Sequence, residues 1–229
     1  MVAANPIITS GTGDANDILT IRPDVLDDVT SITGPFAELR ILHDGADATV
    51  GNGVTVTNVT TVSLEDVNNV ATTLDASEMT SIGTFVVDDA TASVTLDDVQ
   101  STGTAIELSD VDGAANTVTI DFDAQAWSTT DKVVNISVQE VTQGVAVTGL
   151  ADDDFDAVEI TIADAADNAV STLASLASAG AETITITGGT ATYDFGITAA
   201  LDADTTTIAA GSAKSNLSLD VSASTEAMT

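Results

Sequence analysis

Oxygen ligands are the side chains in this sequence with the clearest chemical potential. The chain has 36 acidic residues against four basic ones, and 28 of the acids are aspartate. Clustered oxygen ligands on loops are typical of calcium sites. We therefore expect calcium as the cofactor, bound by candidate ligands in three stretches: Asp14 and Asp17 in GTGDANDIL, Asp110, Asp112 and Asn116 in DVDGAAN, and Asp152, Asp153, Asp154 and Asp156 in ADDDFD.

Two of these stretches partly match known calcium loops. DVDGAAN follows the opening of a Dx[DN]xDG loop, without the third ligand and the closing Glu. GTGDANDIL approximates one Gly-Gly-x-Gly-x-Asp nonapeptide, without a neighbouring copy. ADDDFD is a dense acidic cluster that either binds a cation or is solvated. Aspartate also bonds its own backbone in turns, so the excess of aspartate predicts turn chemistry first and calcium second.

Catalytic constellations are sparse, and we expect the protein not to be an enzyme. His43 is the only histidine and adjoins Asp44, but sequence neighbours seldom form a working acid–base pair, so we interpret it as a loop histidine. The sequence has no cysteine and no serine in a Gly-x-Ser-x-Gly context to act as nucleophile. Acid pairs that cleave glycans need aromatic platforms, and Trp127 and Tyr193 are the only Trp and Tyr.

The net charge of −32 restricts the partners. Nucleic acid is excluded because its binding needs a basic footprint, and an anionic membrane surface would repel the chain. No apolar run approaches the ~20 residues of a membrane-spanning helix, so we expect no membrane insertion. The lack of cysteine is ordinary in a secreted bacterial or archaeal protein, and no signal peptide is visible. We expect an extracellular or cell-surface protein. Without a visible signal, either export uses another route, the signal has been removed, or the protein stays inside.

Short runs of alternating apolar and polar residues predict strands from Val54 onward. Each run ends in Asp, Asn, Ser or Gly, and a Leu-x-Asp-Val frame occurs four times, starting at Leu26, Leu64, Leu96 and Leu108. Leu should point inward, Asp should stand at the corner, and Val should begin the following face. Successive aliphatic anchors recur at nearly constant spacing, and they are Leu64, Leu74, Val86, Leu96, Leu108 and Ile120.

Regular strand spacing of this kind has two interpretations, both all-β. One is a β-solenoid, a stack of short strands in coils of ~22 residues, and the other is a β-sandwich with hairpin connections. Hairpins favour Asn-Gly or Asp-Gly turns. Asp-Gly occurs only twice, whereas similar corners follow similar strands throughout. We therefore expect a β-solenoid-like stack and keep the sandwich as the alternative.

The chain divides into three predicted segments. Residues 1–53 hold all three prolines and two of the four basic residues, and we expect a cap or linking segment. Residues 54–149 form the β-repeat region. Residues 150–229 form a variant β unit with a C-terminal tail. Within it, the helical spacing of Val170, Leu173 and Leu176 before Gly180 predicts one short helix near 165–179.

Several stretches resemble the repeat regions of bacterial surface-layer proteins and type I-secreted RTX surface proteins. The similar stretches are 59–99, with TTLDASEMTSIG inside it, and LASLASAGAETITITGG at 173–189. The resemblance implies a calcium-dependent β-solenoid or β-roll that assembles outside the cell. The sequence lacks the family's tandem glycine-rich nonapeptides.

The function we expect is structural. The chain would be an extracellular subunit that self-assembles into a surface layer or filament with the help of calcium or other divalent cations, which screen its charge. Edge pairing between end coils would drive this, with residues 1–13 and 212–229 as candidate contacts. The alternative is a monomeric adhesin or the stalk module of a larger secreted protein.

Overall fold

The computed structural model describes most of the chain. The described residues are 7–9, 16–43, 45, 48–101, 103–123, 133–148, 156–163, 171–178, 181–190, 194–200 and 207–220. Apart from one short helix, α1 (Pro23–Leu26), the regular elements of this part are strands. None of its helices is long and apolar enough to cross a membrane.

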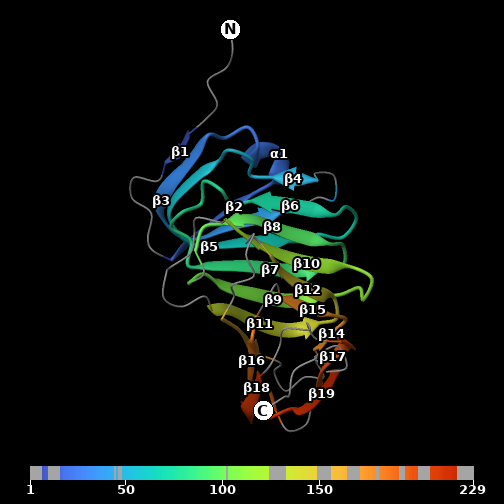
Figure 1. Ribbon diagram of the computed structural model, residues 1–229. Coiled ribbons are helices and arrows are strands. Elements are labelled where there is room, and N and C mark those ends of the chain that lie inside the picture. Colours follow the sequence, from blue (N-terminus) through green and yellow to red (C-terminus); the bar gives the residue numbers. More distant parts are fainter. Residues whose placement is uncertain are drawn as a thin grey trace.

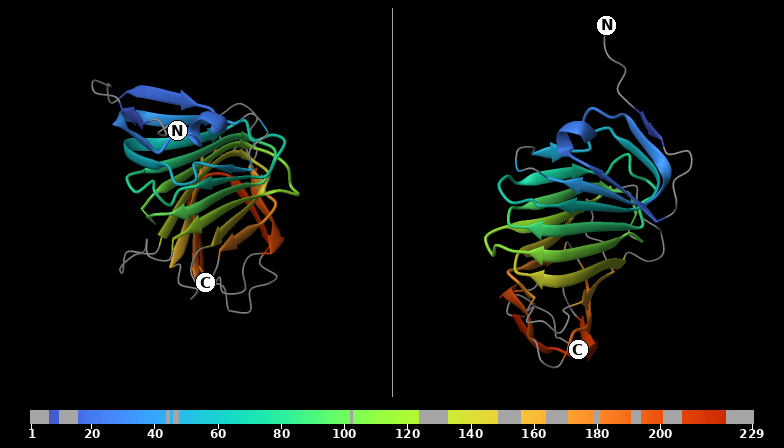
Figure 2. Two further views of the ribbon diagram at one scale, coloured as in Figure 1. Left: turned by 90° about the horizontal axis from the view of Figure 1, so that it is seen from above. Right: turned by 180° about the vertical axis from the view of Figure 1, so that it is seen from behind.

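The strands form a β-solenoid of about seven turns, with the first and last described strands at opposite ends (Figures 1 and 2). Most coils contribute one strand to each side of the stack. Sheet A contains β1 (Ile7–Thr9), β2 (Asp17–Ile21), β3 (Ser31–Leu42), β5 (Thr55–Glu65), β7 (Thr84–Ala90), β9 (Ala105–Val111), β11 (Val133–Val141), β13 (Ala157–Ile162), β16 (Thr183–Gly188) and β18 (Thr207–Ala213). Sheet B contains β4 (Thr49–Val50), β6 (Thr72–Asp75), β8 (Val94–Val99), β10 (Thr117–Phe122), β12 (Gly144–Thr148) and β15 (Leu176–Ser178). Sheet C follows sheet B along the same side with β14 (Thr172–Leu173), β17 (Asp194–Ala200) and β19 (Asn216–Asp220).

Every strand pair in the described part is parallel, which confirms the solenoid and excludes hairpins between these strands. The sequence offset between paired residues measures the length of each coil. The offset is short between β7 and β9, where Thr84 pairs with Ala105, and longer between β12 and β15, where Val145 pairs with Leu176. The short coil length expected from the strand spacing is therefore confirmed in the middle of the repeat region. Other coils are longer because their corners contain more residues.

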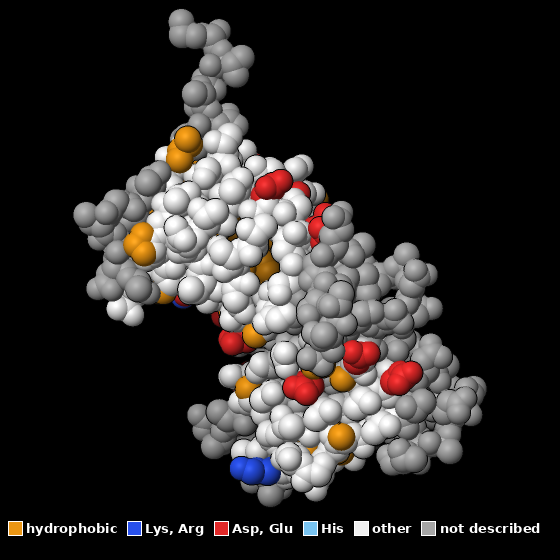
Figure 3. Space-filling model, turned by 60° about the vertical axis from the view of Figure 1, so that its left-hand side comes forward, with side chains coloured by type: hydrophobic (Ala, Val, Ile, Leu, Met, Phe, Trp, Pro, Cys, Tyr) orange, Lys and Arg blue, Asp and Glu red, His pale blue; other side chains and the backbone are white. Residues whose placement is uncertain are grey.

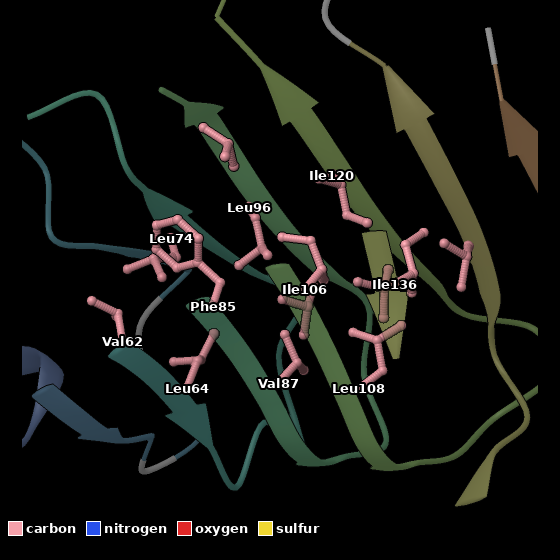
Figure 4. Packing of buried hydrophobic residues seen from close by; sticks show 14 of the residues in the cluster. Val62, Leu64, Leu74, Phe85, Val87, Leu96, Ile106, Leu108, Ile120 and Ile136 are labelled. Carbon is pink, nitrogen blue, oxygen red and sulfur yellow. The ribbon is translucent and has the colours of Figure 1, made fainter. Parts of the chain in front are cut away.

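The core is a thin layer of aliphatic side chains between the two sides of the stack (Figure 4). Alternate residues of each strand point inward, so that Phe85 pairs with Ile106 and Ile106 with Ile136 in successive coils. These side chains are at most 2% exposed. Burial of one such side chain contributes about 1.5–3 kcal/mol, and stacking repeats it at every coil. The β-branched residues thus stabilise the fold through burial of their side chains in the core as much as through their preference for strands.

The repeated Leu-x-Asp-Val frame has a specific backbone geometry. Leu64 and Val67 are both fully buried although two residues separate them. This is possible because Asp66 adopts a positive φ of 65°, which turns the chain so that the residues between Leu64 and Val67 face outward. Aspartate tolerates this left-handed conformation better than most residues. The predicted role of Asp at the corner is confirmed, and similar positive φ angles occur at Asp89, Asp98, Asp110 and Glu140.

The frame that begins at Leu26 ends a helix and not a strand. Leu26 is the last residue of α1, and Leu26 and Val29 are both buried. The Asp27 carboxylate accepts a hydrogen bond from the Gly51 backbone N–H at 3.1 Å. The helix thereby covers sheet B at the N-terminal end of the stack.

The helix predicted near 165–179 is wrong over residues 171–178, where the chain forms β14 and β15. Residues 165–170 and residue 179 of that range lie outside the described part. Leu173 and Leu176 are both buried. Their spacing comes from a corner between two short strands, which turns the chain back to the core. Sheet A crosses both predicted segment boundaries, at 53/54 and 149/150, and the division into three segments stays a prediction.

Corner side chains tie neighbouring coils together. Gln143 is fully buried, and its amide nitrogen donates to the carbonyl oxygens of Ala90, Ala92 and Asp112 at 2.7 to 3.2 Å. These bonds join three coils at one corner. Its carbonyl Oε1 is buried without a partner among the described residues.

Candidate functional site

The N-terminal end of the stack combines an open sheet edge with a helix. β1 and β2 both pair with β3, and no described strand pairs with their other edge. At this same end, on the sheet B side of the stack, α1 lies over sheet B (Figure 1). The three exposed large hydrophobic residues of the described part are Ile7, Ile18 and Val25, at 65%, 50% and 47% exposure. They belong to β1, β2 and α1, so all three lie at this end.

The C-terminal end is also open in the described part. β18 is the last strand of sheet A and β19 the last of sheet C. Their aliphatic residues Ile208, Leu217 and Leu219 pack against the core but are only partly buried. Free strand edges with incompletely covered apolar residues are sites at which further strands add. Within the described residues, both ends of the solenoid therefore have strand edges without a pairing partner.

A first acidic column runs along the end of sheet A. It consists of Asp66, Asp89 and Asp110, which occupy equivalent positive-φ positions in successive coils. A hydrogen bond to the Asp66 carboxyl, together with partial burial and the charges of Asp66 and Asp110, raises the pKa of Asp89 above its ordinary value. The column stores electrostatic repulsion, because three like charges repeat at the spacing of the strands, roughly 4.8 Å.

A second acidic column lies on the outer face of sheet B and consists of Asp75, Asp97 and Asp121. Each belongs to a Thr-x-Asp unit, and the threonines Thr73, Thr95 and Thr119 pair in register beside the aspartates. Burial raises the pKa of Asp97, and the charges of Asp98 and Asp121 raise it further. At the two ends of the column, Ser77 Oγ donates to Asp75 and Thr148 Oγ1 donates to Asp121, at 2.6 and 2.9 Å.

The predicted calcium ligands are distributed over several regions. Asp14, Asp152, Asp153 and Asp154 lie outside the described residues. Asp17 begins β2 at the N-terminal end, and Asp156 directly precedes β13. The structure thus does not bring these two stretches to one place within its described part.

The DVDGAAN stretch lies at the β9–β10 corner, and its candidate ligands have two different roles. Asp110 belongs to the first acidic column. Asp112 accepts a hydrogen bond from Thr142 at 3.0 Å, and Asn116 donates to the Thr91 carbonyl at 2.7 Å. Both side chains thus link neighbouring coils. Among the described residues no group of three Asp, Glu, His or Cys side chains has a metal-binding arrangement, and the calcium prediction stays a prediction.

His43 is part of the coil structure. It is 4% exposed, its Nδ1 accepts the Gly45 backbone N–H at 3.0 Å, and its Nε2 lies 3.0 Å from Thr72 Oγ1. The Thr72 hydroxyl in turn donates to the Val70 carbonyl. The imidazole thus carries its proton on Nε2 and bridges two coils.

A hollow near the C-terminal end lies on the outer face of sheet C and has a volume of about 510 Å³. Gly196 forms its floor, flanked in register by Thr172 of β14 and Ser218 of β19. Asp194 and Asp220 contribute carboxylates to the lining. The hollow exists because glycine leaves an outward position empty, and it reaches the edge strand β19.

Sequence reasoning missed three of these features. The Thr-x-Asp column could have been found, since Thr73, Thr95 and Thr119 each stand just before an aspartate with one residue between. The hollow over Gly196 and the exposed hydrophobic end could not have been found from the sequence, because they depend on which strands become neighbours.

Comparison with protein-family models, curated proteins and solved structures finds no match for this chain.

Proposed function

We propose that this chain is the subunit of an extracellular structural polymer, a surface layer or filament, that assembles end to end. The observation that supports this most is the pair of open ends. Sheet A is parallel throughout, so its two edges have the same strand direction and a second copy can continue the sheet without reversal. A head-to-tail contact of this kind does not close on itself and generates filaments.

Assembly, and not turnover, is the proposed mode of action. His43, the residue best suited to acid–base chemistry, bonds inside the coil through both ring nitrogens. The acidic columns are surface features with raised pKa values at Asp89 and Asp97, where bound cations would relieve repulsion. Calcium assistance is part of the proposal and would act by neutralising these columns as the subunits pack.

Negative-stain electron microscopy of the purified protein, with calcium and with a chelator, tests the proposal. We expect filaments or sheets whose amount rises with protein concentration and with calcium. Polymers indifferent to chelation would keep the structural role and remove calcium from it. Isolated particles in all conditions would contradict the proposal and favour the adhesin or stalk module.

A further inference from the structure

The turn between β4 and β5 lies at the N-terminal end of the stack and is tied down on both sides. The backbone N–H of Val54 donates to the Gly51 carbonyl at 3.0 Å, and the Gly51 N–H donates to the Asp27 carboxylate at 3.1 Å. Gly51 and Gly53 have φ angles of +79° and +69°. The turn thus depends on two glycines, and the residue between them, Asn52, stands at its tip.

Asn52 and Gly53 form the only Asn-Gly pair in the sequence. Both residues are exposed, and a Cβ placed on Gly53 would have no atom within 4 Å. Neither the Asn52 side-chain amide nor the Gly53 backbone N–H has a hydrogen-bond partner among the described residues. The two groups therefore have room to approach each other, and water reaches both.

We infer that Asn52 is a site of spontaneous covalent modification, in which its side-chain amide is lost as ammonia. The Gly53 backbone nitrogen gives its proton to water or hydroxide and attacks Cγ of Asn52. A C–N bond forms, the bond between Cγ and Nδ2 breaks, and the leaving nitrogen takes one proton from water and departs as ammonia. A five-membered succinimide ring remains.

Water then opens the succinimide at either of its two carbonyl carbons and is the only co-reactant. One opening gives aspartate at position 52. The other gives isoaspartate, in which the main chain runs through Cβ and Cγ and is longer by one atom. Both products replace a neutral amide with a carboxylate and so change the local charge.

The residue that follows an asparagine determines where this reaction is fast. Ring closure requires the following backbone nitrogen to rotate toward Cγ, and glycine opposes this rotation least because it has no Cβ. Asn58 and Asn135 are also exposed, but each is followed by a buried β-branched residue within a strand, β5 or β11. The side chain and the strand both restrict rotation there. The fold therefore favours the reaction at Asn52 over these two positions.

The modification affects the N-terminal end of the stack. Figure 3 shows acidic side chains already present in the upper, N-terminal part of the molecule. A carboxylate at position 52 adds to them, one residue from the Gly51 N–H that the Asp27 carboxylate binds. The extra main-chain atom of isoaspartate also falls inside a hydrogen-bonded turn that lies between the buried residues Val50 and Val54. We therefore expect the modified protein to be less stable in this coil.

Peptide mapping by mass spectrometry tests the inference on the unmodified protein after storage for several weeks at mildly alkaline pH. Asn52 should convert to the acid about tenfold faster than Asn58 or Asn135 in the same sample. The converted peptide should separate into an aspartyl form and an isoaspartyl form. Conversion at Asn52 that is no faster than at the two strand asparagines would overturn the inference.

Two variants test the role of the turn itself. Gly53→Ala adds a Cβ to the attacking residue in open space and should slow the conversion about tenfold. Asn52→Gln lengthens the side chain by one methylene group and should show no conversion at position 52 over the same period. An unchanged rate in Gly53→Ala would show that the small size of Gly53 is not what permits the reaction, and would overturn the inference.

Thermal melts before and after storage measure the consequence for the fold. Storage should lower the Tm of the unmodified protein by about 2–4 °C and leave the Tm of Asn52→Gln unchanged. An equal loss in the Asn52→Gln variant would contradict the expected effect on the first coil. Peptide mapping detects the modification whether or not the protein assembles, so its result is independent of the proposed polymer.

Discussion

At the scale of single residues, aspartate has two roles that pull in opposite directions. Its tolerance of positive φ lets Asp66, Asp89 and Asp110 turn the chain at equivalent places in successive coils. Because the coils stack in register, the same residues collect into a column of like charge. The geometry that makes the coil thus creates the repulsion, and the raised pKa of Asp89 is its signature.

The Asp97→Asn variant tests this repulsion in the second column. The pKa of Asp97 is raised in the folded state, so the folded protein binds the proton more tightly than the unfolded chain does. The charged form therefore destabilises the fold at neutral pH, and this cost disappears as the pH falls toward the ordinary pKa of aspartate, roughly 4. We expect the variant to be more stable than the unmodified protein at pH 7, by about 0.5–1 kcal/mol after solvent screening, or about 1–4 °C in Tm.

The pH dependence is the decisive part of this prediction. In thermal melts followed by circular dichroism, the advantage of Asp97→Asn should shrink between about pH 7 and pH 4, because the unmodified protein gains stability by protonation. Glu159→Gln is the matched control, since Glu159 pairs with the uncharged Asn135 and Thr185 on the outer face of sheet A. An equal gain in stability in the Glu159→Gln variant would mean that the effect comes from the change in net charge and not from repulsion within the column.

At the scale of elements, the positions of strands could be predicted from the sequence, whereas the pairing between strands could be predicted only in part. Alternation in a stretch such as Thr84–Ala90 defines a strand with one buried face, and the steady spacing of successive strands favours stacking over hairpins. The helix expected near 165–179 shows the limit, because Leu173 and Leu176 have the same spacing on a helix face and across a strand corner. Only the neighbouring coils decide between the two, because β15 pairs with β12 of the preceding coil and β14 with β17 of the following coil.

Glycine at a coil corner gives a second prediction. Gly188 has a φ of +79°, and a Cβ there would overlap the Ile162 carbonyl oxygen of the preceding coil. Gly53 has a φ of +69° with no atom within 4 Å of such a Cβ. Both alanine variants suffer the left-handed strain of about 1 kcal/mol, but Gly188→Ala must also displace a coil.

We expect Gly53→Ala to lower the free energy of unfolding by about 1 kcal/mol and Gly188→Ala by more than about 2 kcal/mol. Urea denaturation followed by circular dichroism measures both. Similar losses for the two variants would mean that the coils near Gly188 are not packed as tightly as the structure has them.

At the scale of the whole molecule, the exposed large hydrophobic residues are concentrated at one end of the solenoid. The two acidic columns lie along the body of the stack, whereas the exposed large hydrophobic residues of the described part belong to β1, β2 and α1 at the N-terminal end, beside exposed carboxylates such as Asp24. Composition predicted an acidic all-β protein, because β-branched residues and aspartate dominate the sequence. It could not locate the ends of the stack, because exposure of Ile7, Ile18 and Val25 depends on where the last coil stops. The calcium ligands named from spacing alone stay predictions.

End-to-end assembly has a direct signature in X-ray fibre diffraction from aligned filaments. Strands in the solenoid run across its long axis and repeat at roughly 4.8 Å along it. If subunits stack through their ends, the filament axis and the solenoid axis coincide, and the reflection at roughly 4.8 Å should be strong on the meridian. The same reflection on the equator would mean that subunits associate side by side, and would contradict the account.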